Sequence, residues 1–103
     1  MRVELASAAD AELAEAAAWY LAQGLESEHG LDLAERFVDA VERGMSLIAE
    51  RPQLHAEIEP GVRRAVLRDF PYSLVYAIEP DCVLVLAVMH HKRMPGYWRG
   101  RTR

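Results

Sequence analysis

The spacing of apolar and polar positions changes twice along the chain. Residues 3–5 (VEL) alternate, which predicts a short strand close to the first residue. A helix is expected to follow, because Ser7 and Asp10 have the spacing of a capping box and Gly24 supplies a stop. Its apolar positions recur at helical spacing: Leu13, Ala17, Tyr20 and Leu21.

A second helical stripe follows the polar link ESEHG (26–30) and is expected to end before Pro52. Its apolar members are Ala34, Phe37, Val41, Met45 and Ile48, and acidic residues occupy the opposite side. The short link predicts an antiparallel helical hairpin. Because neither stripe is wide enough for a fully buried helix, each helix must lie on another layer.

That layer is predicted from the residues after Pro60-Gly61, where alternation and β-branched or aromatic residues dominate. Three segments, VRRAVLRDF (62–70), YSLVYAI (72–78) and CVLVLAVMH (82–90), are separated by Pro71 and by the turn-like EPD (79–81). Such short connections favour a three-stranded antiparallel meander, which the N-terminal strand can extend. The predicted fold is therefore α+β, in the order β-α-α-β-β-β.

Size and composition fit one soluble domain over residues 1–103, with 51% apolar and 27% charged residues and no repeat or linker. Cys82 is the only cysteine, so no internal disulfide is expected. The longest apolar run, CVLVLAVM, is too short to span a bilayer, and the first ten residues lack the apolar core of a signal peptide. We expect a cytoplasmic protein with no membrane association.

Charge is unevenly distributed between the two parts of the chain. Residues 1–60 carry four arginines against thirteen acids, whereas residues 61–103 carry eight cations against three acids. A compact basic surface suits a nucleic acid or an acidic protein partner. Ordinary solvated charge is the alternative explanation.

The second half of the chain, PGVRRAVLRDFPYSLVYAIEPDCVLVLAVMHHKRMPGYWRGR, follows a helical segment LAERFVDAVERGMSLIAERP (33–52). Together they resemble the RelE/ParE superfamily of toxins from bacterial type II toxin–antitoxin modules, often labelled plasmid-stabilisation proteins. The shared features are Arg63-Arg64 leading into a strand, FPYSLVY, an apolar strand ending in His90, and then Arg93 and Trp98-Arg99.

The resemblance implies a toxin that a cognate antitoxin holds inactive, with a heterotetramer or larger complex as one expected assembly. It implies a target as well, either ribosome-bound mRNA that the toxin cuts or DNA gyrase that it inhibits. RNA-cleaving relatives present several lysines, whereas this chain has only Lys92, and its tail is more similar to the ParE-like branch. A gyrase inhibitor and a non-toxic interaction module on the same fold both remain open. A metabolic enzyme ranks last, because no phosphate-binding loop or nucleophile–base motif is present.

Metal-independent RNA cleavage needs a base, an acid and cations that stabilise charge on the phosphorane. The candidates for catalysis are His90, Arg64 and Arg93, and no cofactor is expected. The candidates for target binding are Arg63, Arg68, Tyr97, Trp98 and Arg99.

Strand alternation predicts how these candidates share faces. Arg64 and Arg68 should lie on one face of their strand, opposite Arg63, and His90 should share a face with Leu84, Leu86 and Val88. We expect Arg64, Arg68 and His90 on the open face of the sheet. A structure with His90 under the helices would remove that assignment. His90 and His91 should point to opposite faces, so no metal chelate is expected, and Glu57 and Glu59 are expected to belong to a polar loop.

Overall fold

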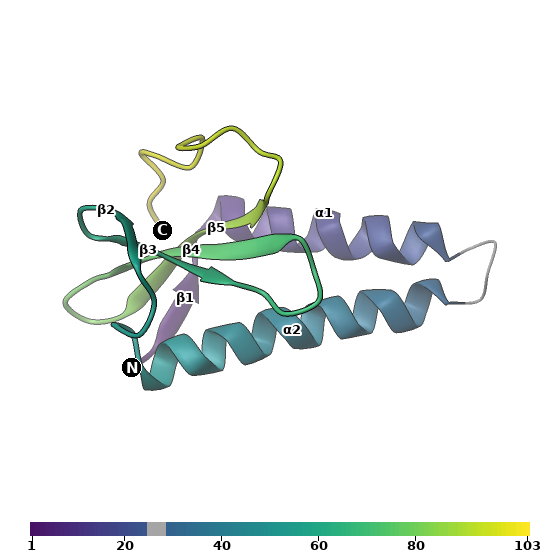
Figure 1. Ribbon diagram of the computed structural model, residues 1–103, viewed down its shortest axis with the longest axis horizontal. Coiled ribbons are helices and arrows are strands. Elements are labelled where there is room, and N and C mark those ends of the chain that lie inside the picture. Colours follow the sequence, from purple (N-terminus) through teal and green to yellow (C-terminus); the bar gives the residue numbers. More distant parts are fainter. Residues whose placement is uncertain (25–28) are drawn as a thin grey trace.

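The structure is a computed structural model that describes residues 1–24 and 29–103 (Figure 1). Its elements are β1 (Val3–Leu5), α1 (Ser7–Gln23), α2 (Gly30–Glu50), β2 (Glu57–Glu59), β3 (Val62–Val66), β4 (Tyr72–Ile78) and β5 (Val83–His90). The strands form one sheet in the order β1-β5-β4-β3-β2, with β1 parallel to β5 and the other neighbours antiparallel. The predicted α+β class is confirmed, and so is the order of a short strand, two helices and then strands.

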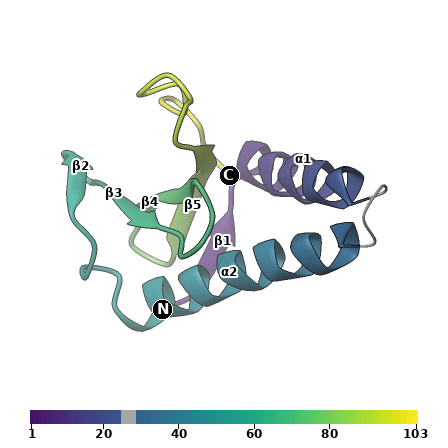
Figure 2. The same ribbon diagram turned by 45° about the vertical axis from the view of Figure 1, so that its right-hand side comes forward.

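The two helices lie side by side and pack against one face of the sheet, and the far end of the hairpin extends beyond it (Figures 1 and 2). Of the predicted stripe in α2, Ala34, Phe37, Val41 and Ile48 are buried, and Met45 is partly buried against the core. Gly44 lets α2 approach β4 closely, since a Cβ there would lie 3.0 Å from Leu74 Cδ1. Residues 26–28 of the polar link lie outside the described part of the chain.

The start of α1 differs from the prediction. The helix begins at Ser7 with Ala6 as its N-cap, and no side chain caps it, so the capping box of Ser7 and Asp10 is wrong. The Ala6 N–H instead donates to Val85 O at 2.9 Å, which fixes the helix start to β5. The helix buries Ala9 and Ala16, whereas Leu21 is 45% exposed. Gly24 follows the last helical residue, as predicted.

The sheet has five strands, one more than predicted from the three-stranded meander and the N-terminal strand. Residues 57–59, expected to form a loop, make strand β2, which pairs with β3. Gly61 has φ +79, a left-handed conformation that turns the chain tightly from β2 back onto β3. Glu57 and Glu59 are therefore edge-strand residues.

A bulge interrupts the alternation of β5. Val75 pairs with Ala87, but the next residue, Tyr76, pairs with Val85, so Leu86 is left without an opposite residue. Side chains before and after Leu86 therefore change faces, and Leu84 is not on the face of Val88. The predicted shared face of Leu84, Leu86, Val88 and His90 is wrong for this reason.

Residues 91–103 follow β5 as a segment without helix or strand, which we call the C-terminal segment. It loops out from the end of β5 and returns towards β1 and β5 (yellow in Figures 1 and 2). Trp98 is only 3% exposed and belongs to the hydrophobic core. The segment is thus part of the packed structure.

Within residues 1–24 and 29–103, the longest apolar stretches of the helices fall short of what a membrane crossing requires.

Candidate functional site

His90 closes β5 on the side of the sheet that the helices cover. Its ring lies 4.9 Å from the ring of Tyr72, its cross-strand partner, and Tyr72 in turn contacts Phe37 of α2. The Nδ1 atom accepts a hydrogen bond from the Lys92 N–H at 3.0 Å. His90 also lines a cleft of about 400 Å³ between α1 and the ends of β4 and β5. The prediction that His90 shares an open face with Arg64 is therefore wrong.

Arg64 lies on the opposite face of the sheet, which we call the outer face. Its Nε donates to Ser73 Oγ at 2.9 Å, and the same oxygen lies 3.0 Å from Nε2 of His91. The register explains this grouping, because Ser73 pairs with both Val66 and Met89, so that Arg64, Ser73 and His91 share a face. His91 was not among the candidates predicted from the sequence; the signal was Ser73, the small polar residue of the stretch FPYSLVY.

Arg68 does not continue the face of Arg64. Strand β3 ends at Val66, and Asp69 adopts φ 69, a left-handed conformation that turns the chain out of the strand. Arg68 consequently lines a groove of about 340 Å³ between α2 and the β3–β4 turn, together with Arg36 and Arg43 of α2. The predicted pair of Arg64 and Arg68 on one face is wrong.

Arg63 is used to fix the chain between α2 and β2. Its Nη1 donates to the carbonyl oxygens of His55 at 2.6 Å and Gln53 at 3.2 Å, and its Nη2 lies 3.5 Å from Glu57. Its guanidinium is thus occupied by this loop and strand, a structural role that competes with target binding.

The C-terminal segment is fastened to the body of the protein by its own aromatic and basic residues. The Tyr97 hydroxyl donates to Glu12 at 2.7 Å, and the Arg93 guanidinium lies 4.0 Å from the Tyr97 ring centre. Burial and the neighbouring Glu12 raise the pKa of Tyr97. Arg99 donates to Glu59 of β2 at 2.8 and 3.0 Å, and Trp98 is buried.

Glu12 and Arg101 complete this fastening at the unpaired part of the β5 edge. Beyond β1, the Val88 N–H donates to Glu12 at 3.1 Å, and Arg101 donates both to Glu12 at 2.8 Å and to Leu86 O at 3.0 Å. The pairing with Glu12 raises the pKa of Arg101. Neither residue was predicted from the sequence, because 89 positions separate them.

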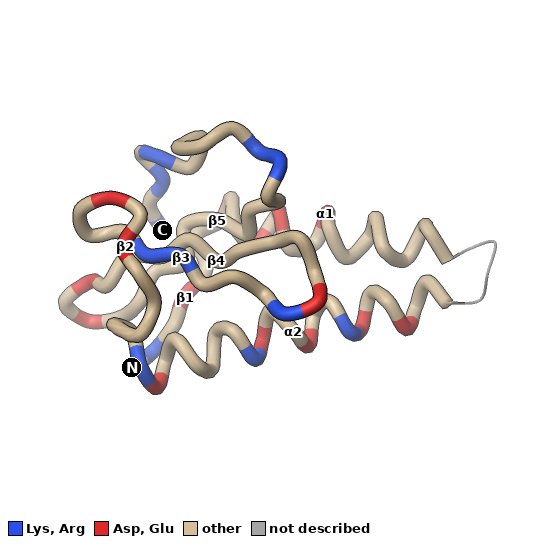
Figure 3. Tube along the Cα trace, in the orientation of Figure 1, with Lys and Arg blue, Asp and Glu red and all other residues tan. Residues whose placement is uncertain are grey.

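Lys and Arg are spread over α2, β3, the β3–β4 turn and the C-terminal segment (Figure 3). Arg99, Arg101 and Arg103 pair with Glu59, Glu12 and Glu4, all from the acidic first part of the chain. Residues 91–95 form a continuous exposed stretch of the segment, in which Met94 is 77% exposed beside Lys92 and Arg93. We call residues 92–94 the Lys-Arg-Met ridge.

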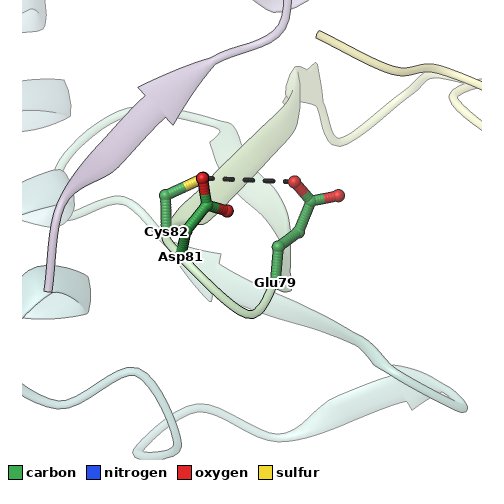
Figure 4. A group of neighbouring side chains, drawn as sticks. All are labelled: Glu79, Asp81 and Cys82. Atoms are coloured by element: carbon green, nitrogen blue, oxygen red, sulfur yellow. Dashed lines mark hydrogen bonds between the residues drawn. The ribbon is translucent and has the colours of Figure 1, made fainter.

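Glu79, Asp81 and Cys82, in the turn between β4 and β5, have ligand atoms within 4.8 Å of one another (Figure 4). Carboxylates with a thiolate are a possible zinc-type donor set. Arg103 already lies among these atoms, with Nη2 at 2.8 Å from Asp81, 3.2 Å from Glu79 and 2.9 Å from Cys82 Sγ. The cluster therefore binds a protein cation, and its geometry serves to hold the end of the chain.

Comparison with known proteins places this arrangement in a class. A chain of a solved structure, the chromosomal ParDE TA system from P. aeruginosa, shares the fold with a TM-score of 0.72 and 19% identity, covering 87% of this chain and 95% of that one. No curated protein is matched by the sequence. The model of the family described as "ParE toxin of type II toxin-antitoxin system, parDE" matches residues 3–95, and the chain belongs to this family.

Proposed function

We propose that the protein arrests bacterial growth by binding DNA gyrase, and that a cognate antitoxin neutralises it. Membership of the ParE toxin family supports the toxin role and the antitoxin partner. The observation that carries the choice of target is the separation of the three catalytic candidates: Arg64 lies on the outer face, while His90 and Arg93 line the helix-side cleft. His90 and Arg93 share the cleft, but Arg64 on the other face cannot act on the same phosphodiester. The incomplete set of catalytic candidates favours inhibition by binding.

The Lys-Arg-Met ridge is the contact surface that we assign to this activity. It is exposed, it combines two cations with a large apolar side chain, and its base is held by Tyr97, Trp98 and Arg99. Anchoring a loop in advance lowers the entropy cost of binding a protein target. The C-terminal segment thus presents a pre-ordered basic surface.

For the antitoxin, we assign the groove between α2 and the β3–β4 turn. Gly44, Leu47 and Leu67 are among its apolar lining residues. Three arginines (Arg36, Arg43 and Arg68) outnumber the two aspartates that also line it, Asp39 and Asp69. A disordered segment that alternates acidic and apolar residues, and folds on binding, is complementary to such a groove.

Inducible expression of the full chain in bacteria tests the target. We expect growth arrest with SOS induction and DNA breaks, while transcripts remain intact. Cleaved transcripts would instead support the mRNA branch, and unimpaired growth at confirmed soluble expression would support a non-toxic interaction module.

Variants in the same experiment locate the surface. Exchange of both Lys92 and Arg93 for Glu should relieve growth arrest. Arg51→Glu, a charge reversal at the end of α2, should leave growth arrest unchanged. His90→Ala and Arg64→Ala report on the catalytic alternative: relief by both, together with transcript cleavage, would contradict gyrase inhibition.

A further inference from the structure

Ser73 is a polar residue in the hydrophobic interior of the described part of the chain. It is 0% exposed. A buried hydroxyl destabilises a fold unless it is hydrogen-bonded. The Ser73 hydroxyl has two hydrogen-bonding partners. One is Arg64 of β3, and the other is His91, which directly follows β5. Both side chains are thereby held in fixed orientations on the outer face.

The geometry at Arg64 leaves its outward atoms available. Because Nε donates to Ser73, the two terminal Nη groups keep their N–H donors for another acceptor. Within residues 1–24 and 29–103 no carboxylate lies within ion-pair distance of Arg64, in contrast to Arg63, Arg99, Arg101 and Arg103. A guanidinium without an acidic partner, fixed by a buried hydroxyl, has the arrangement that binds a phosphate through two parallel hydrogen bonds.

His91 adds a second group of suitable chemistry. His91 is an exposed residue, and its Nε2 is hydrogen-bonded to Ser73 Oγ. The backbone N–H of His91 donates to Pro71 O at 2.9 Å, which fixes the residue against the start of β4. With Nε2 held in this way, Nδ1 is the ring atom that remains for a ligand.

We propose that Arg64, Ser73 and His91 form a binding site for the phosphodiester backbone of a nucleic acid, with Arg64 and His91 as contacts and Ser73 as the positioning residue. This goes beyond the proposed function, because inhibition of gyrase through protein contacts requires no phosphate site on the toxin. The site binds and does not cleave. Backbone phosphate is common to RNA and DNA, so the experiment must distinguish these two sources.

Binding of fluorescently labelled oligonucleotides to the full chain, measured by fluorescence anisotropy over a range of salt concentrations, tests the site. The probes are a single-stranded RNA, the DNA of the same sequence and its duplex. Arg64→Ala should weaken binding about tenfold and lower the slope of log affinity against log salt by about 0.7 for a single strand, the value for one phosphate contact. His91→Gln should weaken binding less, because it removes an auxiliary contact.

The matched control is Arg51→Ala, which removes one exposed arginine at the end of α2 and should change binding less than twofold. Ser73→Ala tests positioning: affinity should fall while the salt slope stays, because the Arg64 charge remains but loses its fixed orientation. Thermal unfolding of each variant checks that it folds. If Ser73→Ala does not fold, Arg64→Lys replaces it as the test of positioning, because lysine keeps the charge but loses the guanidinium geometry.

The proposal is overturned if no probe binds at low salt, or if Arg64→Ala and Arg51→Ala weaken binding equally, which would indicate charge alone. Equal affinity for RNA and DNA indicates that the site contacts the phosphate backbone only. Tighter binding of RNA indicates that the 2′-hydroxyl also contacts the protein. These outcomes are independent of growth arrest, so failure of the site and failure of the gyrase proposal are distinguishable.

Discussion

The carboxylate of Glu12 and the guanidinium of Arg101 lie 2.8 Å apart, with side chains only 15% and 20% exposed. Both also bind the backbone of β5, Glu12 at the Val88 N–H and Arg101 at the Leu86 carbonyl. The pair thus supplies the hydrogen bonds that a neighbouring strand would supply, because β1 ends at Leu5 and leaves this part of the β5 edge unpaired.

Glu12→Gln should therefore destabilise the protein by about 3 kcal/mol, because it leaves Arg101 largely buried without its counter-charge. The measurement is urea unfolding followed by circular dichroism. Glu15→Gln, three residues further along α1, is the control; no ion pair joins Glu15 within the described residues, and its effect should stay below about 0.5 kcal/mol. Equal stability of the two variants would contradict a structural role for the pair.

Alkaline pH should destabilise the protein through its tyrosines. Burial raises the pKa of all four, Tyr20, Tyr72, Tyr76 and Tyr97, above the ordinary value of 10.0. A group whose folded pKa is raised contributes stability that is complete below its unfolded pKa and is lost as pH rises towards the folded pKa. The free energy of unfolding should thus fall above pH 10.

Phenolate absorbance measures this directly, since the native protein should ionise its tyrosines at higher pH than the protein unfolded in urea. Tyr97→Phe removes one such group and should reduce the loss of stability above pH 10. Coincident titration curves for native and unfolded protein would contradict the prediction.

The order of elements was predictable because periodicity within α2 and composition within β3–β5 are local properties, and the buried stripe of Phe37, Val41 and Ile48 follows from spacing alone. The faces of the sheet were not predictable in the same way. The bulge at Leu86 and the left-handed turn at Asp69 depend on cross-strand packing, and each moved a residue assigned by strict alternation. Likewise, the acidic partners of Arg99 and Arg101 are fixed by tertiary contacts with β2 and α1.

Cys82 should be shielded by the last residue of the chain. Its side chain is 0% exposed, burial raises the pKa of its thiol, and Arg103 Nη2 lies 2.9 Å from the sulfur. Arg103→Ala opens this contact, so the thiol should react with an aromatic disulfide reagent about tenfold faster, because access limits the reaction of a buried thiol. Arg99→Ala, in the same segment, should leave the rate unchanged; an equal increase would indicate that the whole segment had loosened.

The groove between α2 and the β3–β4 turn gives the last prediction, which concerns the antitoxin. Arg43 and Arg68 line this groove from two elements, and no carboxylate lies within ion-pair distance of either in the described parts of the chain. Arg43→Glu combined with Arg68→Glu should place two acids beside an acidic segment and weaken antitoxin binding about a hundredfold, mainly through faster dissociation. Calorimetry with the purified antitoxin measures the affinity. The double exchange of Lys92 and Arg93 for Glu, which carries the same charge change on the Lys-Arg-Met ridge, is the control. If the ridge variant loses antitoxin binding and the groove variant keeps it, the antitoxin docks on the ridge instead, and it neutralises the toxin by covering the surface that contacts the target.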